Sequence, residues 1–330
     1  MKVVVVGLGS MGKRRIRLMQ AFFEGIEIVG VDSNLERCEE AANQFKIKCF
    51  IKVGDAVAEF SPDAGFVCTS PLSHAAVTRS LLLFGLHVFS EINLVADGYD
   101  ENIMVAKKKG LTLFLSSTPM YRKEIEYITG RVREGSGIHY RYHVGQYLPD
   151  WHPWESYKDF FVGDARTNGC RELLAIELPW MIAAFGPVTE VFVKKAKLTA
   201  LEIDYPDCYT ATLTHKNGTV GQLMVDVVSR KAVRDMEVVG ERIYLRWGGT
   251  PETVSDYDIE KREVRMVECY IRAERDLRYA DNIIEDAYIA EIADFLKTIH
   301  EQSTPRHSFE TDRKILLLVD RFEESAEGDK

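Results

Sequence analysis

The sequence lacks several features that would place it in common classes of protein. No apolar run approaches the ~20 residues that a membrane-spanning helix needs, and the chain opens directly on a strand-like run. The net charge is −9, so the concentrated basic surface that nucleic acids require is absent. These absences predict a cytoplasmic protein that has neither a membrane nor a nucleic acid as a partner.

Cysteine is scarce and scattered. None of the six cysteines has a close partner at the short spacing of a zinc site, and we expect reduced thiols at Cys38, Cys49, Cys68, Cys170, Cys208 and Cys269. His139 and His143 are four residues apart, but no further ligand-type residue follows at metal-site spacing. The sequence therefore predicts no bound metal.

The first part of the chain alternates apolar runs with helical patterns. Strands are predicted at residues 2–6, 26–31, 64–69, 87–91 and 112–116, and helices at 11–22, 35–45, 54–60, 74–84 and 100–109. Strands that alternate with helices form a doubly wound parallel sheet. Residues 1–119 are therefore expected to be one α/β domain.

From residue 120 to 330 the order of elements changes. Helices are predicted at 123–134, 171–185, 282–300 and 310–326, and strands at 139–146, 188–199, 208–215, 219–228, 237–247 and 254–259. Asn217-Gly218 is a strong two-residue hairpin signal between two of these strands. We expect an α+β domain with a largely antiparallel, open-faced sheet.

The apolar run Val3 to Val6 leads directly into Gly7-Leu8-Gly9-Ser10-Met11-Gly12. Gly7 permits a sharp turn, Gly9 lets a pyrophosphate approach the backbone, and Gly12 lets the next helix pack closely. The pyrophosphate would lie at a helix N-terminus, which favours anions. This pattern predicts a Rossmann dinucleotide site.

An acidic residue after the second predicted strand indicates which dinucleotide is bound. Asp32 follows Gly12 by 20 residues, where its carboxylate can accept hydrogen bonds from a ribose and repel a 2′-phosphate. NAD is therefore expected in preference to NADP. The predicted cofactor-binding residues lie at the carboxyl ends of the strands and are Gly7, Leu8, Gly9, Ser10, Met11, Gly12, Asp32, Ser33, Arg37, Thr69, Ser70, Pro71, His74, Glu91 and Asn93.

With these motifs the chain resembles the Gfo/Idh/MocA family of NAD(P)-dependent oxidoreductases. The resemblance rests on Gly7–Gly12, Gly30-Val31-Asp32, Thr69-Ser70-Pro71 with His74, His87-Val88 with Glu91, Glu237-Val238-Val239-Gly240-Glu241 and the closing Glu324-Ser325-Ala326-Glu327-Gly328. It implies a sugar, sugar phosphate or nucleotide sugar as substrate, and a homodimer or homotetramer.

The chain departs from the family where the family's catalytic groups lie. The resemblance implies Glu-Lys-Pro after the fourth strand, but here the triplet is Glu91-Ile92-Asn93. It also implies an aspartate and a histidine on one helix, and alignment through Asn168-Gly169 places Leu173 and Glu177 there. The usual catalytic lysine and histidine are both missing.

Glu177 is the only ionisable residue between Leu173 and Phe185, and Pro179 follows it inside the expected helix. A carboxylate in such apolar surroundings is costly unless it is paired, protonated or facing a polar cavity. We therefore predict Glu177 as a general base with a raised pKa. The alternative is a structural ion pair with Arg171, Arg141 or another partner.

An aromatic segment follows the strand expected at residues 139–146. Aromatic faces stack on sugar rings, so Tyr147, Trp151, Trp154 and Tyr157 are predicted substrate contacts, together with Arg171. His152 is a second candidate for proton transfer because its ordinary pKa lies near neutrality. The alternative is an oligomer contact or a satellite apolar cluster.

The sequence thus predicts an NAD-dependent oxidoreductase that acts on a carbohydrate CH–OH group, with a non-standard proton relay. Surface-polysaccharide or amino-sugar metabolism is the setting that the resemblance implies. Two alternatives remain open: a redox-neutral epimerase that uses NAD, and a non-catalytic protein that senses NAD or a sugar.

Overall fold

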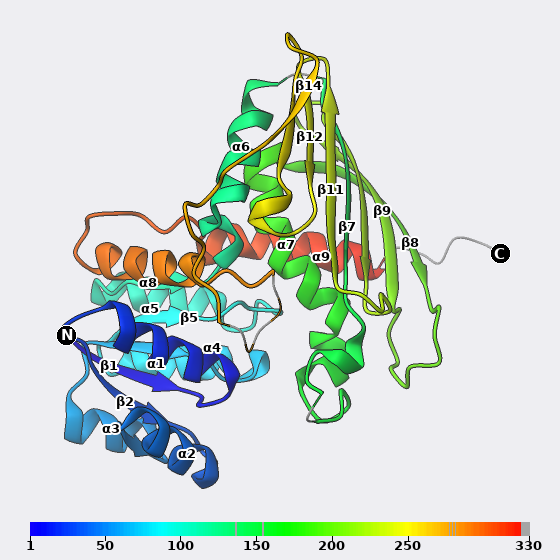
Figure 1. Ribbon diagram of the computed structural model, residues 1–330. Coiled ribbons are helices and arrows are strands. Elements are labelled where there is room, and N and C mark those ends of the chain that lie inside the picture. The colour runs from blue at the N-terminus through cyan, green and yellow to red at the C-terminus, as the bar shows by residue number, and fades with distance from the viewer. Residues whose placement is uncertain (136, 154, 277, 279, 281, 325–330) are drawn as a thin grey trace. The chain divides into compact units, whose positions relative to one another are not determined.

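The computed structural model describes residues 1–135, 137–153, 155–276, 278, 280 and 282–324. The chain divides into two compact units. Unit 1 comprises Met1–Ser117 and Tyr288–Arg313, and unit 2 comprises Thr118–Ala287 and the chain from Lys314 onward. Figure 1 labels their helices and strands.

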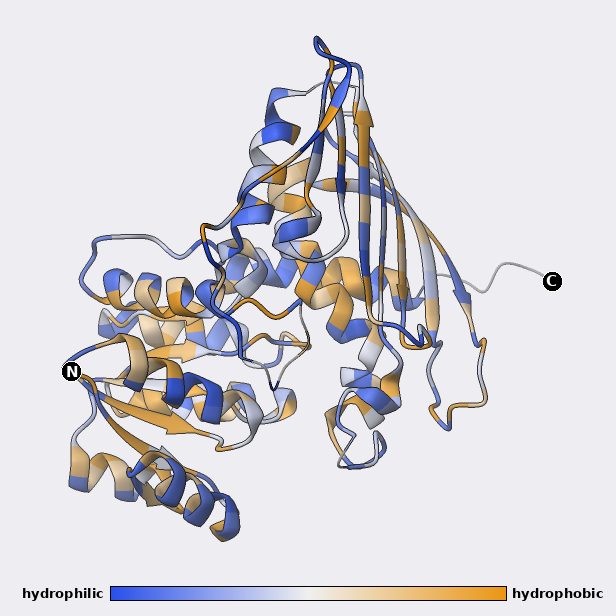
Figure 2. Ribbon diagram, viewed as in Figure 1, coloured by the Kyte–Doolittle hydropathy of each residue, from blue (hydrophilic) through white to orange (hydrophobic). Residues whose placement is uncertain are grey.

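Unit 1 contains a parallel sheet of six strands in the order β3-β2-β1-β4-β5-β6. The strands are β1 (Lys2–Val6), β2 (Glu27–Val31), β3 (Lys48–Phe50), β4 (Ala64–Val67), β5 (His87–Ser90) and β6 (Leu113–Leu115). Their residues are apolar on both faces, as Figure 2 shows for β1 and β2, because helices cover both sides of such a sheet. The predicted doubly wound α/β fold is confirmed.

Helices of unit 1 pack on both faces of this sheet. They are α1 (Ser10–Phe22), α2 (Leu35–Phe45), α3 (Val53–Phe60), α4 (His74–Leu83), α5 (Tyr99–Lys109) and the part of α8 (Glu285–Ile299) from Tyr288 onward. Ala56, Leu81 and Ala106 from α3, α4 and α5 lie in one apolar cluster with Val4 and Val67. On the other face, Phe295 of α8 packs edge-on against Phe66, Phe89 and Phe114.

The division between the units differs from the expected boundary in one respect. The sequence suggested a single boundary after residue 119, and the chain does pass into unit 2 near it, at Thr118. However, Tyr288–Arg313 return to unit 1, whereas the sequence placed them in the second domain. The physical reason is burial: Phe295 completes the aromatic cluster, and Glu291 pairs with the buried Arg15 at 2.7 Å.

Unit 2 contains a sheet of eight strands in the order β14-β13-β12-β11-β7-β10-β9-β8. The strands are β7 (His139–Gly145), β8 (Val188–Ala196), β9 (Cys208–His215), β10 (Val220–Asp226), β11 (Val233–Gly240), β12 (Ile243–Trp247), β13 (Ser255–Asp258) and β14 (Glu263–Met266). Only β7 and β10 are parallel neighbours, so the sheet is largely antiparallel, as predicted.

The helices of unit 2 lie on one side of its sheet (Figure 1). They are α6 (Lys123–Glu134), α7 (Gly169–Phe185) and the part of α9 (Phe309–Glu324) from Lys314 onward. Asn168 caps α7 by accepting a hydrogen bond from the backbone N–H of Arg171 at 2.8 Å. The opposite face of the sheet carries exposed side chains, including Phe192 at 76% exposure, and the strands alternate between polar and apolar residues (Figure 2).

Three strand assignments needed correction. The run predicted as one strand at 237–247 is a hairpin of β11 and β12, whose two loop residues, Glu241 and Arg242, are not the asparagine and glycine typical of such turns. The short strands β3 and β14 were not predicted. Both lie at sheet edges, where few residues are needed to continue the hydrogen-bond ladder.

No helix in the described part of the chain is long and apolar enough to cross a membrane. All six cysteines are free thiols, as expected.

Candidate nucleotide site and the polar core of unit 2

The glycine turn of unit 1 has the geometry expected of a pyrophosphate cradle. Gly7 has φ of +93°, and a Cβ there would lie 2.5 Å from the carbonyl oxygen of Cys68, the residue that follows β4. A Cβ at Gly12 would lie 1.9 Å from the carbonyl oxygen of Gly7. By contrast, a Cβ at Gly9 would meet nothing within 4 Å. The fold itself therefore requires glycine at positions 7 and 12, where a side chain would collide with the backbone. Gly9 instead leaves open space that a bound group can approach.

Helix α1 begins directly after this open space. Gly9 is its N-cap, and no side chain caps the helix there. The first backbone N–H groups, at Ser10 and Met11, are therefore available to an anion, and the helix dipole favours one. The residues present fit the pyrophosphate of a dinucleotide.

Asp32 closes the adenosine side of the predicted site. It follows β2, is 8% exposed, and accepts hydrogen bonds from the backbone N–H groups of Leu8 at 2.8 Å and Asn34 at 2.9 Å. These contacts fix the carboxylate against the glycine turn, and each oxygen retains a lone pair for a ribose hydroxyl. Arg37 Nη1 lies 4.0 Å from Asp32 Oδ2, and Ser33 is exposed beside it.

We expect Asp32→Asn to raise the affinity for NADP relative to NAD by about tenfold or more. A tenfold change corresponds to the free energy of one charge-assisted hydrogen bond. The substitution removes the charge that repels a 2′-phosphate but keeps an acceptor for Leu8 N–H. Isothermal titration with both cofactors measures the ratio, and Glu36→Gln, an exposed acid in the first turn of α2, is the matched control. An unchanged ratio would refute the role of Asp32.

The loop after β4 is tied to the segment after β5. His74 contacts the carbonyl oxygen of Thr69 through Nε2 and the side chain of Asn93 through Nδ1, both at 2.8 Å. Burial lowers the pKa of His74, although both contacts oppose that shift, so its imidazole is neutral at physiological pH. His74 and Asn93 are buried and support the loop, whereas Ser70 is exposed and Pro71 begins a short 3₁₀ turn.

Glu91 belongs to a buried ion network that the sequence did not predict. Arg15 is fully buried and bonds to Glu91 at 2.6 Å, Glu291 at 2.7 Å and Ser116 at 3.2 Å. Glu291 also accepts from Ser117 N–H at 2.7 Å. Burial alone would lower the pKa of Arg15, but the two carboxylates raise it above its ordinary value.

Two basic residues in the first turns of α1 pair with carboxylates of the protein. Lys13 pairs with Glu40 at 2.6 Å, and Arg15 is neutralised by two carboxylates. The signal available in the sequence was Arg15 on the apolar face of α1, one residue before the buried Ile16.

In unit 2, Glu177 is 1% exposed and its carboxylate contacts three polar side chains in the core. Arg234 Nε donates to one oxygen at 2.9 Å, while Tyr142 Oη at 2.8 Å and Trp180 Nε1 at 2.7 Å donate to the other. The structure therefore shows the ion pair that was the alternative interpretation. The partner is Arg234 of β11, and the named candidates Arg171 and Arg141 bind other carboxylates.

The aromatic segment packs partly into unit 2. Trp151 Nε1 donates to Gln146 O at 3.2 Å, and Tyr157 Oη accepts from Glu202 N–H at 3.2 Å. The guanidinium of Arg230 lies 3.7 Å from the ring centre of Tyr147. Trp154 lies outside the described residues.

His152 has specific partners of its own. Its Nδ1 is 2.7 Å from Glu155 Oε1, and its ring stacks on Phe160 with 4.3 Å between centres. This contact between neighbours three residues apart orders the loop. Nothing in it singles out His152 as a proton-transfer group, and its catalytic role stays a prediction.

Arg171 is 6% exposed and points toward α9. It pairs with Asp320 at 2.7 Å and with Glu323. Because these carboxylates already occupy its guanidinium, the geometry favours a structural role over the predicted substrate contact.

Glu172 is a residue that the sequence did not single out. Its Oε2 atom is inaccessible to solvent and has no hydrogen-bond partner in the described part of the chain. Burial raises the pKa of Glu172 from the ordinary 4.5 to about 8. The sequence does not show which side chains of α7 are buried, because that depends on the face of the helix that packs against the sheet. Glu172 and Glu177 point to different faces of the helix.

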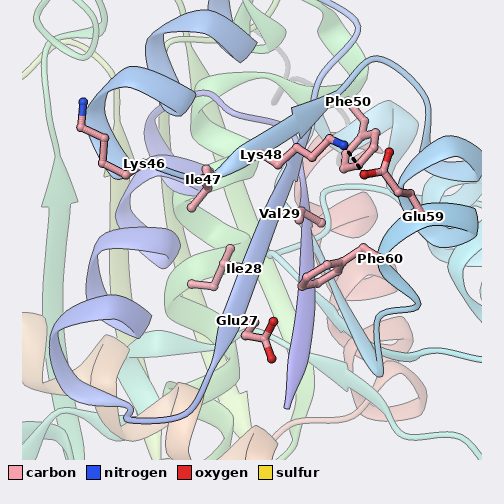
Figure 3. A pocket seen from close by; sticks show the side chains of 9 residues that line it. All are labelled: Glu27, Ile28, Val29, Lys46, Ile47, Lys48, Phe50, Glu59 and Phe60. Atoms are coloured by element: carbon pink, nitrogen blue, oxygen red, sulfur yellow. Dashed lines mark hydrogen bonds and ion pairs between the residues drawn. The ribbon is translucent and has the colours of Figure 1, made fainter.

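A separate cavity of about 350 Å³ lies on the outer part of unit 1. It is lined from β2, β3 and α3, and the Lys48–Glu59 ion pair spans its wall (Figure 3). None of the predicted cofactor residues lines it, so it is distinct from the glycine turn.

Comparisons with known proteins agree with this geometry. Residues 1–117 match the family model Gfo/Idh/MocA, described as an oxidoreductase family with an NAD-binding Rossmann fold. The matched residues make up about a third of the chain and include the glycine turn and Asp32.

Two named relatives resemble this protein over nearly the whole chain. UDP-N-acetylglucosamine 3-dehydrogenase of Acidithiobacillus ferrooxidans is 26% identical over 91% of this chain and 88% of its own. Its structure has a TM-score of 0.76 at 22% identity, covering 99% and 98% of the two chains. WlbA dehydrogenase of Chromobacterium violaceum, solved with NADH and UDP-GlcNAcA, has a TM-score of 0.75 at 17% identity, covering 99% and 93%.

Proposed function

We propose that this Gfo/Idh/MocA member is an NAD-dependent dehydrogenase that acts on a CH–OH group of a nucleotide sugar. The observation that carries the proposal is the glycine turn. Of its three glycines, Gly9 is the one with open space beside it at the start of α1, and the carboxylate of Asp32, fixed by Leu8 N–H, can accept a hydrogen bond from a ribose. The nicotinamide, when bound, supplies a hydride acceptor or donor. The protein must hold it, orient the sugar and move the hydroxyl proton.

The nucleotide-sugar class is supported from two sides. The relative that matches over 91% of this chain carries the name UDP-N-acetylglucosamine 3-dehydrogenase. In unit 2, Arg230 stacks on Tyr147, and Lys231 follows it in an exposed segment after β10. An aromatic ring beside exposed cations suits a substrate that combines a sugar or base with phosphates.

The test is to incubate the purified protein with NAD and a panel of UDP-sugars, sugar phosphates and free sugars, and to record absorbance of the reduced nicotinamide. We expect turnover of a UDP-sugar with a kcat/KM at least about tenfold above that of the matching free sugar. A tenfold ratio corresponds to the free energy of one hydrogen bond to a phosphate. Hydrogen exchange at a sugar carbon without net reduction would instead indicate a redox-neutral epimerase. Binding of NAD and sugar with neither reaction would indicate a sensor.

We further propose that two or four copies associate through the exposed face of the unit 2 sheet, and that the protein acts in the cytoplasm. The support is a sheet whose helices all lie on one side, with Phe192 at 76% exposure on the other, and six free cysteines. Light scattering of the same sample that measures a monomer mass would exclude the assembly.

A further inference from the structure

The loop after β4 lies directly against the glycine turn. A Cβ at Gly7 would lie 2.7 Å from the backbone nitrogen of Thr69, so the two segments are in contact. His74, in the first turn of α4, contacts the carbonyl oxygen of Thr69, whereas the side chain of Ser73, the N-cap of that helix, does not cap it. The position of the loop beside the turn therefore depends on what holds His74.

His74 is one end of a series of contacts between buried polar side chains. It contacts Asn93 Oδ1 at 2.8 Å, which leaves the amide nitrogen of Asn93 to donate to Tyr99. Burial and Asp312 raise the pKa of Tyr99, and its hydrogen bond with the Asn93 side chain lowers it. Tyr99 Oη donates to Asp312 Oδ2 at 2.5 Å, and Asp312 Oδ1 lies 2.8 Å from His307 Nε2. These five residues, each at most 4% exposed, are called the Tyr99 network below.

The whole Tyr99 network lies within unit 1, although Asp312 is 213 residues away from Tyr99. The first turn of α9 packs on α5, where the ring of Phe309 meets the ring of Tyr99 edge-on with 4.8 Å between centres. Residues 1–117, which match the family model, end well before this turn. The start of α9 therefore supports a loop of the dinucleotide-binding segment from outside it.

Helix α5 is also packed closely against the start of α4. Gly98, its N-cap, has φ of +68°, and a Cβ there would lie 3.0 Å from the Cβ of Ala75. Asn102, one turn further along α5, donates to the carbonyl oxygen of Ala75 at 3.0 Å. Because the two helices are in contact on both sides of Tyr99, a displacement of Tyr99 is passed on to His74.

The segment after β5 is fixed from a second direction. Glu91 lies two residues before Asn93 and binds Arg15 of α1 at 2.6 Å. The stability of the α5–α9 contact does not by itself require polar residues, because apolar groups of the same shape can replace a buried hydrogen-bonded pair at little cost. What the hydrogen bonds add is a defined geometry, since a satisfied buried network is rigid.

We propose that Tyr99 and Asp312 are positioning residues of the NAD site, which hold the Thr69 loop against the glycine turn through Asn93 and His74. Both are buried, so they act through these residues and not by contact with the cofactor. A loop that is not held must be ordered when NAD binds, and that cost appears as a lower affinity. The inference rests on the NAD site of the proposed function but not on its sugar substrate.

The test is calorimetric titration of NAD into two variants. Tyr99→Phe keeps the ring beside Phe309 and removes the hydroxyl that joins Asn93 to Asp312. We expect its Kd for NAD to rise by about tenfold, the equivalent of one buried hydrogen bond. Asp312→Asn keeps the size of the side chain but has one oxygen to accept from Tyr99 and His307. It should raise the Kd in the same direction, and it keeps the test decisive if Tyr99→Phe does not fold.

A matched control separates positioning from a general loss of stability. His87 Nδ1 accepts from Thr112 N–H at 3.0 Å at the opposite end of β5 from Asn93. His87→Ala should therefore lower the thermal unfolding temperature and leave the Kd for NAD within about twofold. In addition, the double variant Tyr99→Phe/His74→Gln should bind NAD no more than about twofold more weakly than His74→Gln alone, because both residues act on one loop through the same contacts.

The possible failures are distinguishable. A wild type that does not bind NAD contradicts the NAD site, and both the proposed function and this inference fall with it. A wild type that binds NAD but turns over no sugar contradicts the proposed function alone. If the wild type binds NAD, the positioning role is overturned when the folded variants of Tyr99 and Asp312 keep its Kd within about twofold, or when the Tyr99→Phe and His74→Gln effects on Kd multiply.

Discussion

Replacing Arg15 with methionine should lower the free energy of unfolding by about 3–5 kcal/mol, the usual cost of removing one partner from a buried ion network. The methionine fills most of the space but removes the guanidinium that lies between Glu91 and Glu291 in the interior of unit 1. Burial and the nearby Glu91 already raise the pKa of Glu291, while Arg15 and the Ser117 N–H lower it. The decrease in the free energy of unfolding should be largest at neutral and alkaline pH.

Acidification should restore part of this stability. Without Arg15 the folded-state pKa of Glu291, which burial already raises, rises further above its unfolded value, so the variant is most stable at low pH and loses stability as pH rises. Urea denaturation at pH 5 and pH 8 measures the difference. Lys13→Met is the matched control, since it breaks an exposed pair with Glu40 that contributes at most about 1 kcal/mol. Equal stability of the two variants would contradict a structural role for the network.

Gly9→Ala should weaken NAD binding by about 100-fold or more, equal to about 2.7 kcal/mol, and leave stability nearly unchanged. The added methyl group meets no protein atom within 4 Å, and the backbone of Gly9 has φ of −73°, which alanine adopts readily. It would instead occupy the space at the start of α1 that the pyrophosphate needs.

Two further glycine variants separate binding from folding. Gly12→Ala should destabilise unit 1, because its Cβ would lie 1.9 Å from the Gly7 carbonyl oxygen. Gly54→Ala, in the first turn of α3, has only Phe84 at 3.9 Å and should change neither property by much. Calorimetric titration with NAD and thermal unfolding measure the two effects. If Gly9→Ala bound NAD as tightly as the wild type, the pyrophosphate would not lie beside Gly9.

Local patterns explain which parts of the fold were predictable. The ranges of α2, α6 and β9 match the predicted ranges, because periodicity along one segment is sufficient to define them. The β9–β10 hairpin was signalled by Asn217-Gly218, where Gly218 has φ of +85°. The β11–β12 turn carries no such residue, so two strands were taken for one.

Contacts between distant residues explain what was missed. Glu177 was recognised as an acid that needed a partner, but Arg234 lies 57 residues away on β11. Arg15 and Glu291 are 276 residues apart, and their pairing moves part of α8 into unit 1. Sequence spacing does not contain these distances, since they depend on how the sheets and helices pack.

The sequence by itself determined that the first strand ends in a turn for a dinucleotide, because each glycine and Asp32 acts through backbone geometry within a single strand–turn–helix unit. Only the tertiary structure decided the state of the charged residues. Glu177 is an ion-pair partner, whereas Oε2 of Glu172 is buried without a hydrogen-bond partner among the described residues, and this difference depends on which face of α7 packs against the sheet. That choice is made by long-range packing and not by the order of residues along the helix.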